Sequence, residues 1–266
     1  MNEITASVLL PLDGSSEGFG RDFLDMLRQT GTQVAPGKCG QSEPLRMKCS
    51  SLATDELVPK GWGNSFLWTA ESVGMHGIMD VHKGKTLIFI YGRYSEDALS
   101  QVTAVFQDMT AKWSPEFGWI HVLTDAERQR YRSDYDRLIA PFNRGITEVD
   151  LSSGIPNLGW ITILGRPYTS RIDRSALSKA VYSVRMPAGQ VAGPVVVQLT
   201  REAGDLLKDF DSVDRLRQAA REAIGNDLFK GLGQDAQWVP QELRLSVPKS
   251  TLSDVDGLNC GKSSRT

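Results

Sequence analysis

The sequence predicts an α+β fold in which amphipathic helices pack on a largely antiparallel sheet. An unbroken apolar run within Lys85–Gly92 is rich in β-branched and aromatic residues, as in a strand that is covered on both faces. The next segment, Ser95–Trp113, repeats apolar residues at spacings of three and four, which predicts a helix with one apolar stripe. The alternating segment His76–His82 leads through Gly84 into the buried strand, which predicts an antiparallel hairpin. Since strands and helices interleave irregularly, we expect this architecture rather than a doubly wound parallel sheet.

Before the hairpin, the chain shows one strand and one helix with clear patterns. Ser7–Leu10 is predicted to be a short strand, and Phe19, Phe23 and Leu27 mark the apolar side of a helix. Residues 31–60 show no clean hydrophobic period. We therefore expect mostly loop there, with at most one short helix.

After the long helix, Ser114-Pro115 predicts a helix end, because a residue before proline avoids the helical region. The later segments are then predicted to be a strand at Phe117–Leu123, a charged helix at Asp125–Ile139, a strand at Gly159–Gly165, a short helix at Asp173–Ala180, a strand at Val195–Leu199, and an amphipathic helix that begins at Asp211 or Ser212. We expect residues 1–237 to form a single domain and residues 238–266 to be a partly disordered C-terminal extension.

Charge and cysteine content limit the classes of partner and compartment. The 30 Lys and Arg nearly balance the 32 Asp and Glu, so no excess of charge indicates nucleic-acid binding. No segment approaches the ~20 apolar residues of a membrane span, and no signal segment is evident, so we expect a soluble cytoplasmic protein. Cys39, Cys49 and Cys260 are an odd number at no metal-like spacing. Reduced thiols are the preferred interpretation, and a Cys39–Cys49 disulfide is the alternative.

Two motifs could carry chemistry. Gly14-Ser15-Ser16-Glu17-Gly18 matches the G-x-S-x-G pattern of a nucleophile elbow, but only thirteen residues come before it, whereas such an elbow lies inside a sheet built by earlier strands. A turn that caps a helix is the preferred interpretation. On the predicted strand, His76 and His82 would stand about 20 Å apart, so they cannot share a metal; Asp80 and His82 could share one with a third ligand. We expect no catalytic residue, no cofactor and no metal.

Acidic and aromatic side chains suggest contacts with a partner. One acidic cluster lies within residues 134–150 and another within residues 202–214. Each is either a solvated surface or a patch that engages a basic partner. The six tryptophans mostly lie beside Gly or Pro at the ends of predicted elements, which is typical of core anchors, although one or two could anchor a partner.

Four segments, taken in order, carry a resemblance to a known family. They are Gly61–Trp68 before the hairpin, Ala111–Pro115 with the form x-x-W-x-P, Gly159–Leu164 as a G-W-aliphatic strand, and Gly193–Thr200 before the last helix. In this order and spacing the chain resembles, over residues 1–233, the immunity protein 52 family of bacterial polymorphic-toxin and type VI secretion systems. Ile163 departs from that pattern, since an aromatic residue is common there.

The resemblance implies a non-enzymatic role. Such proteins are cytoplasmic antidotes that bind a secreted toxin, often a nuclease, encoded by the adjacent gene. The implied partner is therefore a cognate toxin, with no direct contact to nucleic acid or membrane. The predicted partner-binding residues are Tyr131, Asp134, Tyr135, Asp136, Glu148 and Asp150. A small serine hydrolase that uses Ser16, and a scaffold protein without a toxin partner, are the alternatives.

Overall fold

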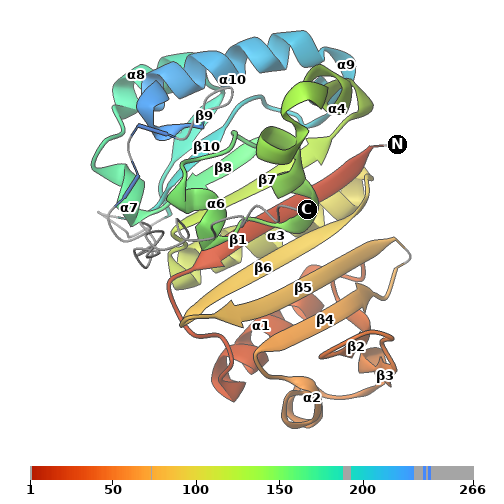
Figure 1. Ribbon diagram of the computed structural model, residues 1–266. Coiled ribbons are helices and arrows are strands. Elements are labelled where there is room, and N and C mark those ends of the chain that lie inside the picture. Colours follow the sequence, from red (N-terminus) through yellow and green to blue (C-terminus); the bar gives the residue numbers. More distant parts are fainter. Residues whose placement is uncertain (1, 73, 188–192, 231–235, 238, 241–266) are drawn as a thin grey trace, which may run out of the picture.

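The described part of the chain forms one ten-stranded sheet in which all neighbouring strands are antiparallel, which confirms the predicted fold class (Figure 1). The computed structural model describes residues 2–72, 74–187, 193–230, 236–237 and 239–240. In order across the sheet, the strands are β3 (Met47–Lys48), β2 (Pro36–Gly40), β4 (Ser65–Ala70), β5 (Met75–His82), β6 (Lys85–Arg93), β1 (Glu3–Leu10), β7 (Phe117–Leu123), β8 (Ile161–Leu164), β10 (Val195–Gln198) and β9 (Ser183–Arg185).

Helices and helical turns connect these strands. They are α1 (Glu17–Thr30), η1 (Cys49–Ser51), α2 (Thr54–Gly61), α3 (Glu96–Trp113), α4 (Asp125–Arg130), η2 (Arg132–Asp134), the π-helical turn η3 (Tyr135–Ile139), α5 (Ala140–Arg144), α6 (Glu148–Ser152), α7 (Arg166–Thr169), α8 (Arg174–Ala180), α9 (Gly204–Lys208), α10 (Phe210–Ile224) and η4 (Asn226–Leu228). Within the described residues, no helix combines the length and the apolar character that crossing a bilayer requires.

The predicted hairpin is confirmed, and its two strands lie between β4 and β1 in the sheet. β5 and β6 pair from Met75↔Gly92 to His82↔Lys85. Gly84, in the turn between them, has a φ of +77°, a conformation that costs glycine little because it has no Cβ. β6 then pairs with β1 over eight residues, so the hairpin is joined directly to the central strand.

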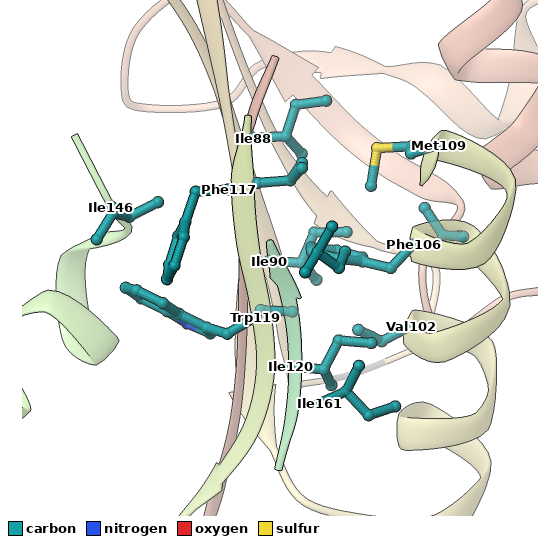
Figure 2. Packing of buried hydrophobic residues seen from close by; sticks show 14 of the residues in the cluster. Ile88, Ile90, Val102, Phe106, Met109, Phe117, Trp119, Ile120, Ile146 and Ile161 are labelled. Atoms are coloured by element: carbon teal, nitrogen blue, oxygen red, sulfur yellow. The ribbon is translucent and has the colours of Figure 1, made fainter. Parts of the chain in front are cut away.

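The predicted long helix is also confirmed, and it packs across the central strands (Figure 2). The Ser95 hydroxyl accepts the Ala98 N–H at 3.1 Å and so caps the first turn of α3. Val102, Phe106 and Met109 are fully buried or nearly so, and Figure 2 shows them facing isoleucines of β6, β7 and β8. We call this side of the sheet the α3 face.

Trp119 and Ile146 lie on the opposite side of the sheet in Figure 2, which we call the α10 face. Alternation along β7 places His121 on the side of Trp119. The His121 ring contacts the Phe142 ring of α5 at a centroid distance of 4.7 Å, and the carboxylate of Glu127 in α4 meets it at 2.5 Å. Arg217 of α10 pairs with that carboxylate. The helices α4, α5 and α10 therefore cover this face over the second half of the sheet.

Residues 31–60 depart from the prediction. They contain β2, β3, η1 and α2 where we expected mostly loop. Pro36–Gly40 holds two glycines and a proline, which are poor strand formers, so its strand conformation comes from pairing with β4 and β3 rather than from propensity. Only the helix near the end of this region matches the expectation.

The cysteines also require a correction. Cys39 on β2 and Cys49 in η1 form a disulfide, with their Cα atoms 6.0 Å apart and both side chains fully buried. The preferred interpretation as reduced thiols was therefore wrong for this pair. The β2–β3 turn brings the two cysteines together. Their separation of ten residues in the sequence does not by itself indicate a disulfide. Cys260 lies outside the described residues.

Two predicted helices have different boundaries. The charged segment 125–139 is divided into α4, η2 and η3 instead of one helix. Pro141, at the start of α5, removes one backbone N–H and crowds the preceding turn, which accounts for the irregular η3. It does not account for the end of α4 at Arg130. The last helix starts at Phe210, and Asp209 caps it by accepting the Ser212 N–H at 3.0 Å. The predicted extension 238–266, apart from Val239 and Pro240, lies outside the described residues.

Candidate functional site

The two tyrosines among the predicted partner-binding residues differ in exposure. Tyr131 follows α4 and is half-buried, and its hydroxyl donates to the carboxylate of Asp214 in α10. Tyr135 is 39% exposed, and its hydroxyl accepts the Asn143 side-chain N–H at 2.5 Å. Asp134 closes η2 and Asp136 lies in η3, while their side chains fall outside what the structure describes.

The two acidic residues on α6 hold the structure together. Glu148 pairs with Lys85 of β6 at 2.7 Å, and the same lysine pairs with Glu116 at 2.7 Å. Burial lowers the pKa of Lys85, but hydrogen bonds to Glu116 and Glu148 outweigh this and raise it overall. These ion pairs join α6 to the ends of the central strands, because Lys85 begins β6 and Glu116 directly precedes β7.

Asp150 is 5% exposed and completes a capping box with Thr147. Both of its carboxylate oxygens also accept from Arg144, at 2.6 and 3.0 Å. Burial raises the pKa of Asp150, while the hydrogen bonds from Arg144 and Thr147 outweigh burial and hold it below its usual range. Between the two acids, Val149 is 65% exposed. Sequence reasoning missed Val149, because one valine in a short helix has no periodic partner.

A buried ion network lies beneath Tyr131. Arg217, 1% exposed, places Nη1 at 2.9 Å from Oε1 of the fully buried Glu127, and the other oxygen of Glu127 contacts His121 Nε2 at 2.5 Å. Asp214 lies 3.6 Å from the same Arg217 nitrogen. Burial raises the pKa of Glu127, but the positive charge of Arg217, together with the contact with His121, outweighs it and lowers the pKa to about 2. Three separate segments of the α10 face are fixed together by these contacts.

The first half of the α10 face is open. Ser7 Oγ accepts the Ile146 N–H at 2.9 Å, so Ser7 points toward α6, and its register partner Phe89 points the same way. Following the registers outward from Phe89 places Ile78 and then Leu67 on the same side. Both side chains are half-buried, and none of the described helices lies over β4 and β5 on this side (Figure 1). Phe89 of β6 is covered instead, since it is 2% exposed and lies against Gly145 between α5 and α6. We call this surface, with the exposed Val149 of α6, the open face.

Aromatic rings and a hollow extend the open face toward the edge of the sheet. The Tyr91 ring stacks on Phe89 and His76, with centroid distances of 5.0 and 5.3 Å. Beyond them is a hollow of about 850 Å³, lined by His76, Thr69 and the β2–β3 turn at Glu43 and Pro44 among others. Half-exposed apolar side chains beside a hollow are typical of a binding surface.

The other sequence candidates have structural positions. The Ser16 hydroxyl accepts the Phe19 N–H at 3.3 Å and caps α1. The described ranges contain no group of three His, Cys, Asp or Glu side chains that could hold a metal ion. Asp80 and His82 therefore have no third ligand of these types among the described residues. The described tryptophans are core residues: Trp62, Trp68, Trp119 and Trp160 are at most 8% exposed, and Trp113 is half-buried against Phe19. Trp238 lies outside the described residues.

No protein-family model matches this chain, and no curated protein sequence matches it. Its fold is similar to a solved structure, the Pseudomonas aeruginosa T6SS protein PA0821, where T6SS denotes the type VI secretion system. The TM-score is 0.55 at 11% sequence identity, and the similarity covers 92% of this chain and 81% of that chain. At this identity, the likeness shows a shared fold.

Proposed function

We propose that this protein is a type VI secretion immunity protein that binds and neutralises a cognate secreted toxin, a nuclease effector, without catalysing a reaction. The observation that carries the proposal is the open face, where Leu67, Ile78 and Tyr91 of three neighbouring strands are half-buried on one side of the sheet. The helix α6, which carries the exposed Val149, is joined to β6 by the Glu148–Lys85 ion pair. Two further observations support it. The fold is shared over nearly the whole chain with a protein described as belonging to a type VI secretion system. The ordered tryptophan motifs resemble immunity protein 52, and within that family the narrower resemblance is to TsiT, the antidote to the effector TseT.

The charges around the open face indicate how the toxin is held. By strand register, Lys38 and Asp80 both border this face, and Glu148 beside Val149 is already paired with Lys85. A rim that carries both signs does not resemble an acidic plug for a nuclease cleft. The proposal is therefore that the chain grips another surface of the toxin with an apolar centre and a polar rim, as stable interfaces commonly do.

Co-expression with the toxin encoded by the adjacent gene tests this function. The wild-type chain should restore growth and should be captured with the toxin. Val149→Arg places a charge where the apolar contact is proposed and should lose both capture and protection, while the thermal midpoint stays unchanged, because the side chain is exposed in the free protein.

Two further variants serve as controls for the co-expression experiment. Asp108→Arg changes an exposed residue of α3, on the opposite side of the sheet, and should keep full protection. Ser16→Ala removes the only hydroxyl that a hydrolase of the G-x-S-x-G type would use, and it should also keep full protection. Protection lost in Ser16→Ala, with the fold retained, or kept in Val149→Arg would contradict the proposal.

A further inference from the structure

A second site lies on the other half of the α10 face, between α10 and the turns that follow α4. A cavity of about 320 Å³ is lined there by Arg217 and Arg221 of α10, by Lys230, and by Tyr131 and Asp214, among others. A water molecule occupies about 30 Å³ in the liquid, so a cavity of this volume can hold a small molecule of several non-hydrogen atoms. It shares no lining residue with the open face.

The cavity wall contains a buried arginine with unused hydrogen-bond donors. Only 1% of Arg217 is exposed, and its Nη1 pairs with Glu127. Among the described residues, its Nε and Nη2 meet no acceptor with full hydrogen-bond geometry, although the Tyr131 hydroxyl contacts the guanidinium. A buried donor without a partner costs free energy, which an acceptor in the cavity would recover.

A second arginine adds positive charge to the same wall. The Arg221 guanidinium lies 4.7 Å from the centre of the Phe229 ring and donates to the Lys230 carbonyl at 3.4 Å. Burial lowers the pKa of Arg221, and the neighbouring charge of Arg217 adds to this lowering. The positive charges of Arg217 and Arg221 therefore repel each other, while Asp214 opposes the lowering.

Two of the negative groups nearby are already engaged, while Glu222 also lines the cavity and is exposed to solvent. Glu127 is shared by Arg217 and His121. Asp214 accepts the Tyr131 hydroxyl, and Gln218 donates to it at 3.4 Å. The cavity therefore combines two guanidinium groups and the 8% exposed Lys230 with two carboxylates, Asp214, which has other partners, and the solvent-exposed Glu222.

We propose that the cavity formed by Arg217, Arg221 and Lys230 binds a phosphate group, either as inorganic phosphate or as the phosphoryl end of a small metabolite. Guanidinium groups match phosphate oxygens in geometry and donate charge-assisted hydrogen bonds. A phosphate offers oxygens in several directions, which suits donors that reach it from α10 and from the segment after η4. A carboxylate offers only two, in one plane.

Calorimetric titration of the full chain with sodium phosphate, in a buffer without phosphate, tests the site. The wild-type chain should bind in a saturable way, and glycerol phosphate should bind at the same site if the physiological ligand is an ester. Arg221→Gln should weaken phosphate binding about tenfold or more, because it removes a charged donor. Arg217 itself is a poor target, since its loss would leave Glu127 buried without its partner.

The matched control is Arg215→Gln. Arg215 is an exposed arginine of the same helix that contacts Ser212, and its replacement should leave phosphate binding unchanged. Sodium chloride at equal ionic strength and sodium acetate should give no saturable signal. The proposal is overturned if the wild-type chain shows no saturable phosphate binding, if Arg221→Gln and Arg215→Gln bind equally, or if acetate binds as tightly as phosphate.

Discussion

The side chain of Glu127 shows how much one buried charge contributes to this fold. Its carboxylate is fully buried between Arg217 and His121, and its pKa is lowered from an ordinary 4.5 to about 2. A carboxyl whose pKa is lower in the folded state stabilises the fold above the unfolded pKa, and that contribution is lost as the pH falls through the folded pKa. The stability that it supplies is therefore complete above about pH 4.5 and disappears toward pH 2.

We therefore predict that Glu127→Gln lowers the free energy of unfolding at pH 7 by about 3–5 kcal/mol, because it leaves Arg217 buried without its charge partner. The loss of stability between pH 4.5 and 2 should also be shallower than in the wild-type chain. Urea unfolding over this pH range measures both effects. Glu56→Gln, at an exposed position of α2, is the control and should change stability by less than about 0.5 kcal/mol. Equal pH profiles for the two variants would contradict this role of Glu127.

The Cys39–Cys49 disulfide is a second contribution of individual residues. It closes a short loop, which should stabilise the chain by about 3 kcal/mol, mainly through the unfolded state. Reductant should lower the urea midpoint of the wild-type chain and leave that of a Cys39→Ala/Cys49→Ala variant unchanged, and peptide mapping without reductant should recover the linked pair. Stability that does not respond to reductant would contradict the assignment. Disulfides persist mainly in oxidising compartments, so this bond stands in tension with the predicted cytoplasmic location, which stays a prediction.

Single residues were also where sequence reasoning was weakest. The sequence places Asp150 in an acidic cluster that could bind a partner. In the structure its carboxylate accepts hydrogen bonds from Thr147 and Arg144 instead. A charge count along the chain cannot separate a solvated acid from one that caps a helix. Arg217 was not identified either, since its partners Glu127 and His121 are distant in sequence.

Elements with a strong local pattern were predictable. The hairpin and α3 follow from hydrophobic period, a turn glycine and a capping serine, all of which act within a few residues. β2 was missed because its strand conformation depends on neighbouring strands rather than on its own residues. The open face was missed for a related reason: its floor belongs to strands with ordinary alternation, and only the tertiary arrangement shows that no described helix covers it.

Two glycines give a matched test at the level of the element. A Cβ at Gly77 of β5 would lie 1.9 Å from the buried Trp68 indole, which packs across that strand. Gly77→Ala should therefore lower the free energy of unfolding by about 1–3 kcal/mol, as overpacked cores do. Thermal or urea unfolding measures this change.

The control is Gly18→Ala in α1, where a Cβ would meet nothing within 4 Å. It should leave stability unchanged or raise it by about 0.5–1 kcal/mol, because alanine loses less backbone freedom in a helix. If Gly77→Ala proved as harmless as Gly18→Ala, the close packing of Trp68 over β5 would be refuted.

At the scale of the whole molecule, one sheet separates the α3 face from the α10 face, and both proposed sites lie on the α10 face. On the α10 face, helices cover the second half and leave the first half open beside α6 (Figure 1). The sequence predicted the fold class and the acidic region near α6. The division of that region into structural acids and an exposed valine could be seen only after folding.

In the proposed function, the protein occupies its toxin in a fixed ratio. Titrating a constant amount of purified toxin with this chain, and measuring the remaining nuclease activity, distinguishes this from catalysis. For tight one-to-one binding, nuclease activity should fall linearly and reach its floor near one chain per toxin, at the same ratio after longer incubation. Complete inactivation by far less than one chain per toxin, advancing with time, would show turnover and rule out stoichiometric inhibition.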